Sequence, residues 1–314
     1  MARSVLSNPI FHDAEKAREW LEAQLWRDGP ICPHCGTVDA ATLMKGKTTR
    51  PGLYQCNACR EPFTVTVGTL YERSKVPLNK WLAATHLMMA SKKGMSALEI
   101  GRLLGLSKKT SWFLCHRIRE SLRSTNLVPM GGEGKQIEAD ETYIGGREKN
   151  KHRSKRNAKN IGGAGKEAVF ALVERKGQVR SQHVQSVTGA TLREILVAQV
   201  DQRSTLNTDD AGQYRHMHRD FARHEVVNHG IEEYVRGEAH TNTIESYFAI
   251  LKRGIFGTFH HVSQQHLKRY LAEFDYRYNE RAALGVDDEM RMRKSVQGIV
   301  GKRLTYRPPH QAIA

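Results

Sequence analysis

Acidic residues in three segments that lie far apart in the chain could together bind divalent cations. Glu138 and Asp140 share one face of a β-like run, the pair Asp209-Asp210 ends a second β-like run, and Glu245 lies early in a helical pattern. Phosphoryl transfer assisted by two divalent ions needs carboxylates that bridge and cap the ions, and these carboxylates come from elements that converge in space. Each acid alone has an ordinary explanation: Glu138 or Glu141 as a solvated strand residue, Asp210 as a helix cap, and Glu245 as a first-turn acid favoured by the helix dipole. Together the three segments predict a site for two Mg²⁺ or Mn²⁺ ions.

Four of the five cysteines form a second candidate metal site. They occur as two CxxC pairs: Cys32, Cys35, Cys56 and Cys59. The spacing of the pairs is typical of a tetrahedral zinc site, and four thiolates leave no coordination position open for catalysis. The aromatic residues Tyr54 and Phe63 and the β-prone run at 63–69 predict the small sheet of a zinc ribbon held by structural Zn²⁺. The alternative is four core cysteines with an accidental spacing.

Helical patterns surround the cysteines and lead up to the first acid. An amphipathic helix is expected at 13–26 with Asp13 as its N-cap, and further helices are expected at 78–91, 96–105 and 107–122. Ser96 and Ser107 are placed as N-caps, and a glycine ends the pattern before each of them.

The last two of these patterns are typical of a helix-turn-helix, because a short helix, a glycine-containing turn and a second helix rich in Ser, Lys and Arg follow one another. The residues expected to contact DNA at the start of the second helix are Lys108, Lys109 and Thr110. The alternative is an ordinary three-helix packing unit with a solvated basic face.

A segment with a proline and three glycines separates the helical region from an α+β region. Short β-like runs follow at 137–144, 168–175, 179–187, 204–209 and 224–229, with a helix near 192–201 and helical patterns at 243–254 and 264–281. In the first run, strand alternation places Glu138 and Asp140 on one face and Ala139 and Glu141 on the other.

The charge of the chain favours a polyanionic partner. Lys and Arg number 49 against 33 Asp and Glu, which gives a formal net charge of +16. Such a charge favours nucleic acid through counterion release, ahead of a membrane surface. No apolar stretch is long enough to span a bilayer, and the first residues lack the apolar core of a secretory signal. A cytoplasmic protein with reduced thiols is therefore expected.

A basic segment follows the first β-like run directly. Residues 147–166 predict a flexible loop that grips DNA phosphates without reading their sequence. The cations expected to bind DNA in this segment and on the later helix are Lys151, Arg153, Lys155, Arg156, Lys252 and Arg253. The alternative is a loop that only improves solubility.

Three strings around the acids are long and specific. They are IEADETYIGGREKNKHRSKR at 137–156, LNTDDAGQY at 206–214, and the string from VNHGIEEY to DYRYNER at 227–281. With the cysteine pairs and helices ahead of them, they resemble the ISXO-like bacterial insertion-sequence transposases. The resemblance covers about residues 15–290.

The resemblance implies an RNase H-like catalytic domain with a mixed five-stranded sheet. It carries over Asp140, Asp209 and Glu245 as the three acids of the DDE motif, and Asn242 remains a rival for the third position because an Asn has been described there. It also implies a metal-dependent enzyme that binds terminal repeats, cleaves the 3′ ends of the element and joins them to target DNA. The partners implied are transposon-end and target DNA, with a homo-oligomer on the DNA in the bacterial nucleoid.

The expected domain order follows from these segments. It is an N-terminal helix with a zinc ribbon at 1–76, a helix-turn-helix-like region at 77–127, a linker at 128–135, the catalytic domain at 136–290 and a C-terminal tail at 291–314. Two other functions stay open, namely a non-catalytic DNA-binding regulator and an RNase H-like nuclease without strand transfer.

Overall fold

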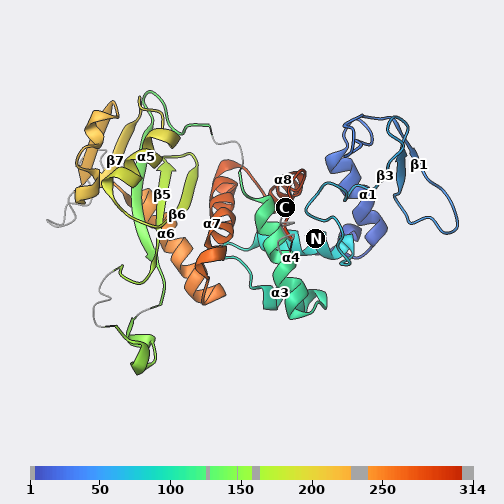
Figure 1. Cartoon of the computed structure of the whole chain (residues 1–314), viewed down its shortest axis with the longest axis horizontal. Helices are drawn as coiled ribbons and strands as arrows, with labels where there is room; N and C mark the ends of the chain where they lie inside the picture. The colour runs from blue at the N-terminus through green and yellow to red at the C-terminus, as the bar shows by residue number, and fades with distance from the viewer. Residues whose placement is uncertain (1–3, 125–127, 147, 158–162, 228–239, 306–314) are drawn as a thin grey trace, which may run out of the picture. The chain divides into compact units, whose positions relative to one another are not determined.

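The computed structural model describes residues 4–124, 128–146, 148–157, 163–227 and 240–305 (Figure 1). The chain divides into two compact units. The first consists of Met1–Arg123 with Ala282–Ala314, and the second consists of Ser124–Arg281.

A small antiparallel sheet forms the ribbon of the first unit. Its strands lie in the order β1 (Ala41–Leu43), β2 (Tyr54–Cys56) and β3 (Pro62–Phe63). The rings of Tyr54 and Phe63 stack with centroids 5.9 Å apart, and Trp26 meets both rings edge-on. The predicted β-run at 63–69 is wrong beyond Phe63, because Thr64–Val67 form a turn closed by a 3.0 Å bond from Val67 N to Thr64 O.

The predicted helices of the first unit are all present. They are α1 (Ala14–Leu25), α2 (Leu78–Ala90), α3 (Ala97–Leu104) and α4 (Lys108–Ser121). The N-caps Asp13, Ser96 and Ser107 are confirmed, because each side chain accepts a hydrogen bond from a first-turn backbone N–H. Gly105 ends α3 with a φ of 61°, a conformation that few residues other than glycine adopt.

A further helix, α8 (Asp288–Gln297), belongs to this unit and was not predicted. It packs on α1, α2 and α4, with Met292 and Val296 buried and Arg291 donating to the backbone O of Met89 (2.8 Å). The predicted boundary at residue 290 falls inside α8. The structure divides the chain earlier, since residues from Ala282 onward group with the first unit.

The second unit is built on a mixed five-stranded sheet in the order β6-β5-β4-β7-β8. Its strands are β4 (Gln136–Ile144), β5 (Glu167–Glu174), β6 (Val179–Val184), β7 (Thr205–Asp209) and β8 (Arg223–Val227). The first three are antiparallel, whereas β7 runs parallel to β4 and β8 parallel to β7. This strand order confirms the predicted RNase H-like fold.

Helices cover both faces of this sheet. They are α5 (Gly189–Gln199), α6 (Asn242–Gly254) and α7 (Gln264–Asn279), with a π-helical turn at Ile255–Phe259 after α6. Ile137 and Ala139 of β4 pack in one core with α5, whereas Ile144 packs in the other core with α6 and α7, which are orange in Figure 1. The polar residues Glu138 and Thr142 of β4 are buried beneath these helices, whereas Asp140 and Glu141 stay partly exposed.

The predicted linker contributes to the same unit. Met130 forms a parallel bridge with Val200, and its side chain is buried in the core beneath α5. Residues 128–135 thus enter the folded unit rather than only leading to it. None of the helices in the described ranges combines the length and the apolar composition that crossing a bilayer requires.

Candidate active site and zinc centre

The register of the central strands brings the first two acids level with each other. β4 and β7 pair in parallel, with Glu138 opposite Asn207. Continuing this register by two residues places Asp140 beside Asp209, the last residue of β7. Both carboxylates are partly buried, and the Asp140 Oδ1 accepts a hydrogen bond from the backbone N–H of Glu141 (2.7 Å).

The third acid comes from α6. Its buried face consists of Ile244, Tyr247, Phe248, Leu251 and Gly254. Glu245 lies beside this face on an exposed part of the first turn, where its Oε1 accepts from the Thr241 hydroxyl (3.1 Å). Asn242, the rival, is the first residue of α6 and is also exposed.

The charges of the other two acids act on Asp140. Burial, together with the negative charges of Glu141, Asp209 and Glu245, raises the pKa of Asp140 from 3.8 to about 8. The carboxylate of Glu245 therefore lies close enough to Asp140 to disfavour its ionisation. Clustered carboxylates of this kind are the oxygen-donor set that Mg²⁺ and Mn²⁺ prefer, and a bound cation would relieve their mutual repulsion.

A fourth acid, Glu141, lies on the face of β4 opposite to that of Asp140, where two side chains from the turn after β7 bind it. Its two carboxylate oxygens accept from Gln213 Nε2 and from the Tyr214 hydroxyl, both at 2.6 Å. Burial raises the pKa of Glu141, and the charge of Asp209 also contributes. The pairing was not predicted, because it depends on the turn after β7; the adjacency of Gln213 and Tyr214 to the Asp209-Asp210 pair was its only signal.

Glu138 lies on the same face of β4 as Asp140, as alternation predicted, but it is not available to a ligand. Its side chain is fully buried against the first turn of α6. The interpretation of Glu138 as a solvated strand residue is wrong, because α6 covers that part of the strand.

The four cysteines of the ribbon form one compact cluster. All four sulfurs lie within 4.8 Å of one another. The Sγ–Sγ separations are 3.7 Å for Cys32–Cys59 and 3.6 Å for Cys35–Cys56. A tetrahedron with Zn–S bonds of about 2.3 Å has edges of about 3.8 Å. The cluster therefore fits a structural Zn²⁺.

The cations predicted to bind DNA are on the surface wherever their side chains are described. Lys108 and Lys109 are exposed, and Thr110 is partly exposed, at the start of α4. In the segment after β4, the exposed cations are Lys151, Arg153 and Arg156, whereas the side chain of Lys155 lies outside the described residues. On α6, Lys252 is half-buried and Arg253 is exposed.

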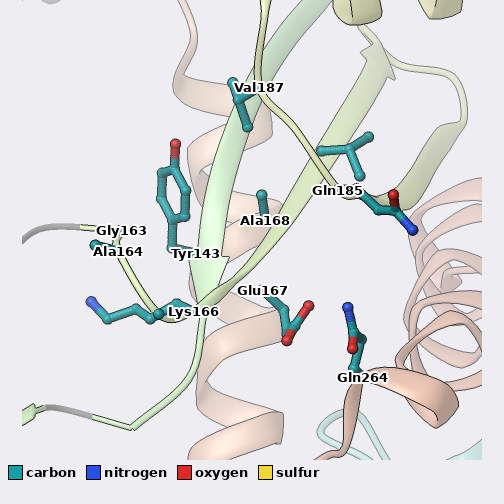
Figure 2. A pocket seen from close by; sticks show the side chains of 11 residues that line it. Tyr143, Gly163, Ala164, Lys166, Glu167, Ala168, Gln185, Val187 and Gln264 are labelled. Carbon is teal, nitrogen blue, oxygen red and sulfur yellow. The ribbon is translucent and has the colours of Figure 1, made fainter. Parts of the chain in front are cut away.

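A hollow of about 610 Å³ lies at the far end of β4 and involves none of the three acids. Figure 2 shows Tyr143, Lys166, Glu167 and Gln264 around it. Glu167 at its edge pairs with His183 Nε2 at 2.7 Å. Lys166 ends the basic segment, so the hollow lies where that segment rejoins the sheet.

An RNase H-like sheet with acids on β4 and at the end of β7, and a third acid on α6, is the arrangement of DDE enzymes, the class that includes transposases. The comparisons agree with this class. Residues 131–279 match the family model of the ISXO2-like transposase domain, and residues 12–61 match that of the transposase zinc-ribbon domain. The chain therefore contains an ISXO2-like transposase domain preceded by a transposase zinc-ribbon domain.

One curated relative spans nearly the same length. It is an uncharacterized protein in transposable element ISH50 of Halobacterium salinarum, 28% identical over 277 residues, which cover 85% of this chain and 91% of the relative. Among solved structures, the Mos1 transposase paired-end complex with left transposon end is 12% identical, with a TM-score of 0.28, over 68% of this chain and 74% of that chain. The simian T-cell lymphotropic virus intasome is 13% identical, with a TM-score of 0.28, over 54% of this chain and 61% of that chain.

Proposed function

We propose that this transposase cleaves the 3′ ends of an insertion sequence and joins them to target DNA, using Asp140, Asp209 and Glu245 as metal ligands. The observations that carry the proposal are the parallel pairing of β4 with β7, which sets Asp140 level with Asp209, and the position of Glu245 on α6, from which its charge raises the pKa of Asp140. Two Mg²⁺ or Mn²⁺ ions bound there would activate the attacking oxygen and stabilise the leaving oxygen of an in-line displacement.

The chain's own residues perform the remaining tasks. Asp140 and Asp209 are held on adjacent strands, so their separation is set by the sheet. Lys252 lies two turns after Glu245 on α6, where its ammonium group can hold a DNA phosphate beside the acids. No covalent bond between protein and DNA is required, because water and then the released 3′-OH are the nucleophiles.

DNA is the partner throughout this proposal. The net charge of +16, the basic segment after β4 and the exposed lysines of α4 support binding to transposon ends and to target DNA. Joining two ends requires at least two protomers on the DNA. Because the substrate is the host's DNA, we infer that the protein acts at the nucleoid, in the cytoplasm of a bacterial cell.

The test compares Asp209→Ala with Asp210→Ala on labelled transposon ends in Mg²⁺ or Mn²⁺. Asp210 is the next residue and is exposed beyond the end of β7, so it controls for loss of one acid. Cleavage and joining should disappear in the first variant and persist in the second. Full cleavage by Asp209→Ala would refute the assignment of Asp209 as a metal ligand. If the wild type cleaved the ends but did not join them to target DNA, the protein would be a nuclease without strand transfer.

A further inference from the structure

The carboxylate of Glu138 binds the start of α6 directly. Its Oε2 accepts from the backbone N–H groups of Thr243 and Ile244, and its Oε1 accepts from the Thr243 hydroxyl, all at 2.9 Å. Arg175, just after β5, donates to the same Oε1 from Nε (2.7 Å). The side chain of Glu138 is 0% exposed. Three of these four donors belong to the first turn of one helix.

Glu138 therefore does what an N-cap residue normally does. The first-turn N–H groups of a helix need acceptors, which usually come from the side chain of the N-cap. The N-cap of α6 is Thr241, but its side chain makes no capping bond, and its hydroxyl donates to Glu245 instead. A negative charge at this helix end is also favoured by the helix dipole. The cap of α6 thus comes from the neighbouring strand.

The position of this cap relates it to the acids. Glu138 precedes Asp140 by two residues on the same face of β4, a distance of about 7 Å along a strand. Ile244, whose amide Glu138 binds, directly precedes Glu245. One buried carboxylate therefore connects the strand that carries Asp140 to the turn that carries Glu245. Arg175 adds a second connection, since its Nη2 donates to the backbone O of His240 (2.8 Å).

We propose that Glu138 is a positioning residue that sets the distance of Glu245 from Asp140, so that a divalent cation meets its third ligand already in place. This role rests on the proposed function, because it assumes that Glu245 is a ligand. Glu138 itself contacts neither metal nor DNA. It acts by fixing α6 on the sheet.

The test uses Glu138→Gln in the zinc-loaded full chain, with Mn²⁺ as the probe. Glutamine keeps the volume but brings an NH₂ group against donors of α6 and Arg175. Residues that orient metal ligands typically change metal affinity by about 10–100-fold. We expect the dissociation constant for Mn²⁺, measured from the spin-resonance signal of unbound Mn²⁺, to rise by about that factor. Cleavage at saturating Mn²⁺ should largely persist.

Asp275→Asn is the matched control. Asp275 is also a carboxylate held inside the second unit, and it accepts from Ser181 N (2.8 Å), Ser181 Oγ (2.7 Å) and the Tyr247 hydroxyl (2.5 Å). It connects α7 to β6 and to Tyr247 in the second turn of α6, and it contacts neither the first turn of α6 nor any of the three acids. This variant should lose thermal stability while leaving the Mn²⁺ affinity unchanged.

Hydrogen exchange without metal provides a readout that does not depend on activity. The amides of Thr243 and Ile244 should exchange faster in Glu138→Gln than in wild type, and at the wild-type rate in Asp275→Asn. An unchanged Mn²⁺ constant in a folded Glu138→Gln would overturn the positioning role, as would an equal rise in both variants. If Glu138→Gln does not fold, Thr243→Val replaces it in the test. We then expect a smaller rise in the Mn²⁺ dissociation constant, because only the hydroxyl donor to Glu138 is removed.

The two proposals fail differently. A wild type that binds no Mn²⁺ at the acids would refute the proposed function, and the positioning role with it. Normal Mn²⁺ binding and cleavage with an unaffected Glu138→Gln would refute only the positioning role.

Discussion

The cluster of acids should destabilise the protein when no divalent cation is bound, and Asp140→Asn tests this. Because the folded pKa of Asp140 is raised from 3.8 to about 8, the folded state binds its proton more tightly than the unfolded state does. The contribution of Asp140 to the free energy of unfolding is therefore fully present below the unfolded pKa of 3.8, and it is lost as the pH rises from about 4 to about 8. Asparagine carries no such charge and can still accept from the Glu141 N–H.

The size of the effect follows from the shift. Each pKa unit corresponds to about 1.4 kcal/mol, so at about pH 7.5 the raised pKa of Asp140 lowers the free energy of unfolding by up to about 5 kcal/mol, mainly because the folded state must take up a proton. Relaxation of the surrounding groups and water reduces this penalty, and we expect the substitution to recover about 2 kcal/mol. For a unit of this size that raises the midpoint of thermal unfolding by about 4–8 °C.

The assay is calorimetry of zinc-loaded protein in buffer without added Mg²⁺ or Mn²⁺. The four tryptophans, Trp20, Trp26, Trp81 and Trp112, all lie in the first unit, so their fluorescence reports the unit that should not change. Mn²⁺ should stabilise the wild type but not Asp140→Asn. A variant no more stable than wild type at about pH 7.5, with the same dependence on pH, would refute the reasoning.

Three further predictions concern the other sites. Removing zinc with a strong chelator, or Cys35→Ser, should unfold the ribbon and expose Trp26 while leaving calorimetric unfolding of the second unit in place, because a unit this small depends on its metal. Glu245→Gln should abolish cleavage in Mg²⁺, whereas Asn242→Ala should retain at least about a tenth of wild-type activity, since a carboxylate binds a hard cation better than an amide. Replacing Lys108 and Lys109 together by Gln should weaken DNA binding and lower the slope of log affinity against log salt by about 2.

Each of these predictions has a contradicting outcome. Trp26 fluorescence that ignores chelation would exclude a structural zinc. If cleavage were lost in Asn242→Ala but kept in Glu245→Gln, Asn242 rather than Glu245 would be the third metal ligand. For the lysine pair, the control is Lys45 with Lys47 replaced by Gln, since both are exposed in the ribbon; an equal change in slope would mean that α4 has no special part in binding.

The sequence predicted the strands of the five-stranded sheet, every α-helix except α8, and the element on which each acid lies, because alternation and capping are local. Ser96, Ser107 and Asp13 could be identified as caps from their neighbours alone. The role of Glu138 could not, since alternation assigns a face to a strand residue but does not say that a helix more than a hundred residues later covers that face. A carboxylate that caps a helix from another element leaves no local signal.

Helix α8 was missed for a related reason. Its sequence DEMRMRKSVQ looks polar, and one of its buried residues is an arginine. Arg291 is buried because its guanidinium donates to two backbone oxygens. One belongs to Met89, which is distant in the sequence, and the other belongs to Val286, just before α8. A periodicity argument counts such a residue as exposed.

The return of α8 to the first unit has a consequence for shortened copies of the gene. The catalytic unit is an insertion within the unit that carries the ribbon and the helix pair, so a premature stop codon anywhere in the catalytic segment also deletes α8. The surfaces of α1, α2 and α4 that α8 covers would then be left bare, and the truncated product would be prone to degradation. Under the proposed function, such a stop codon would remove cleavage and DNA binding together. A fragment that still binds DNA without cleaving it would require an internal deletion that keeps both α1–α4 and α8.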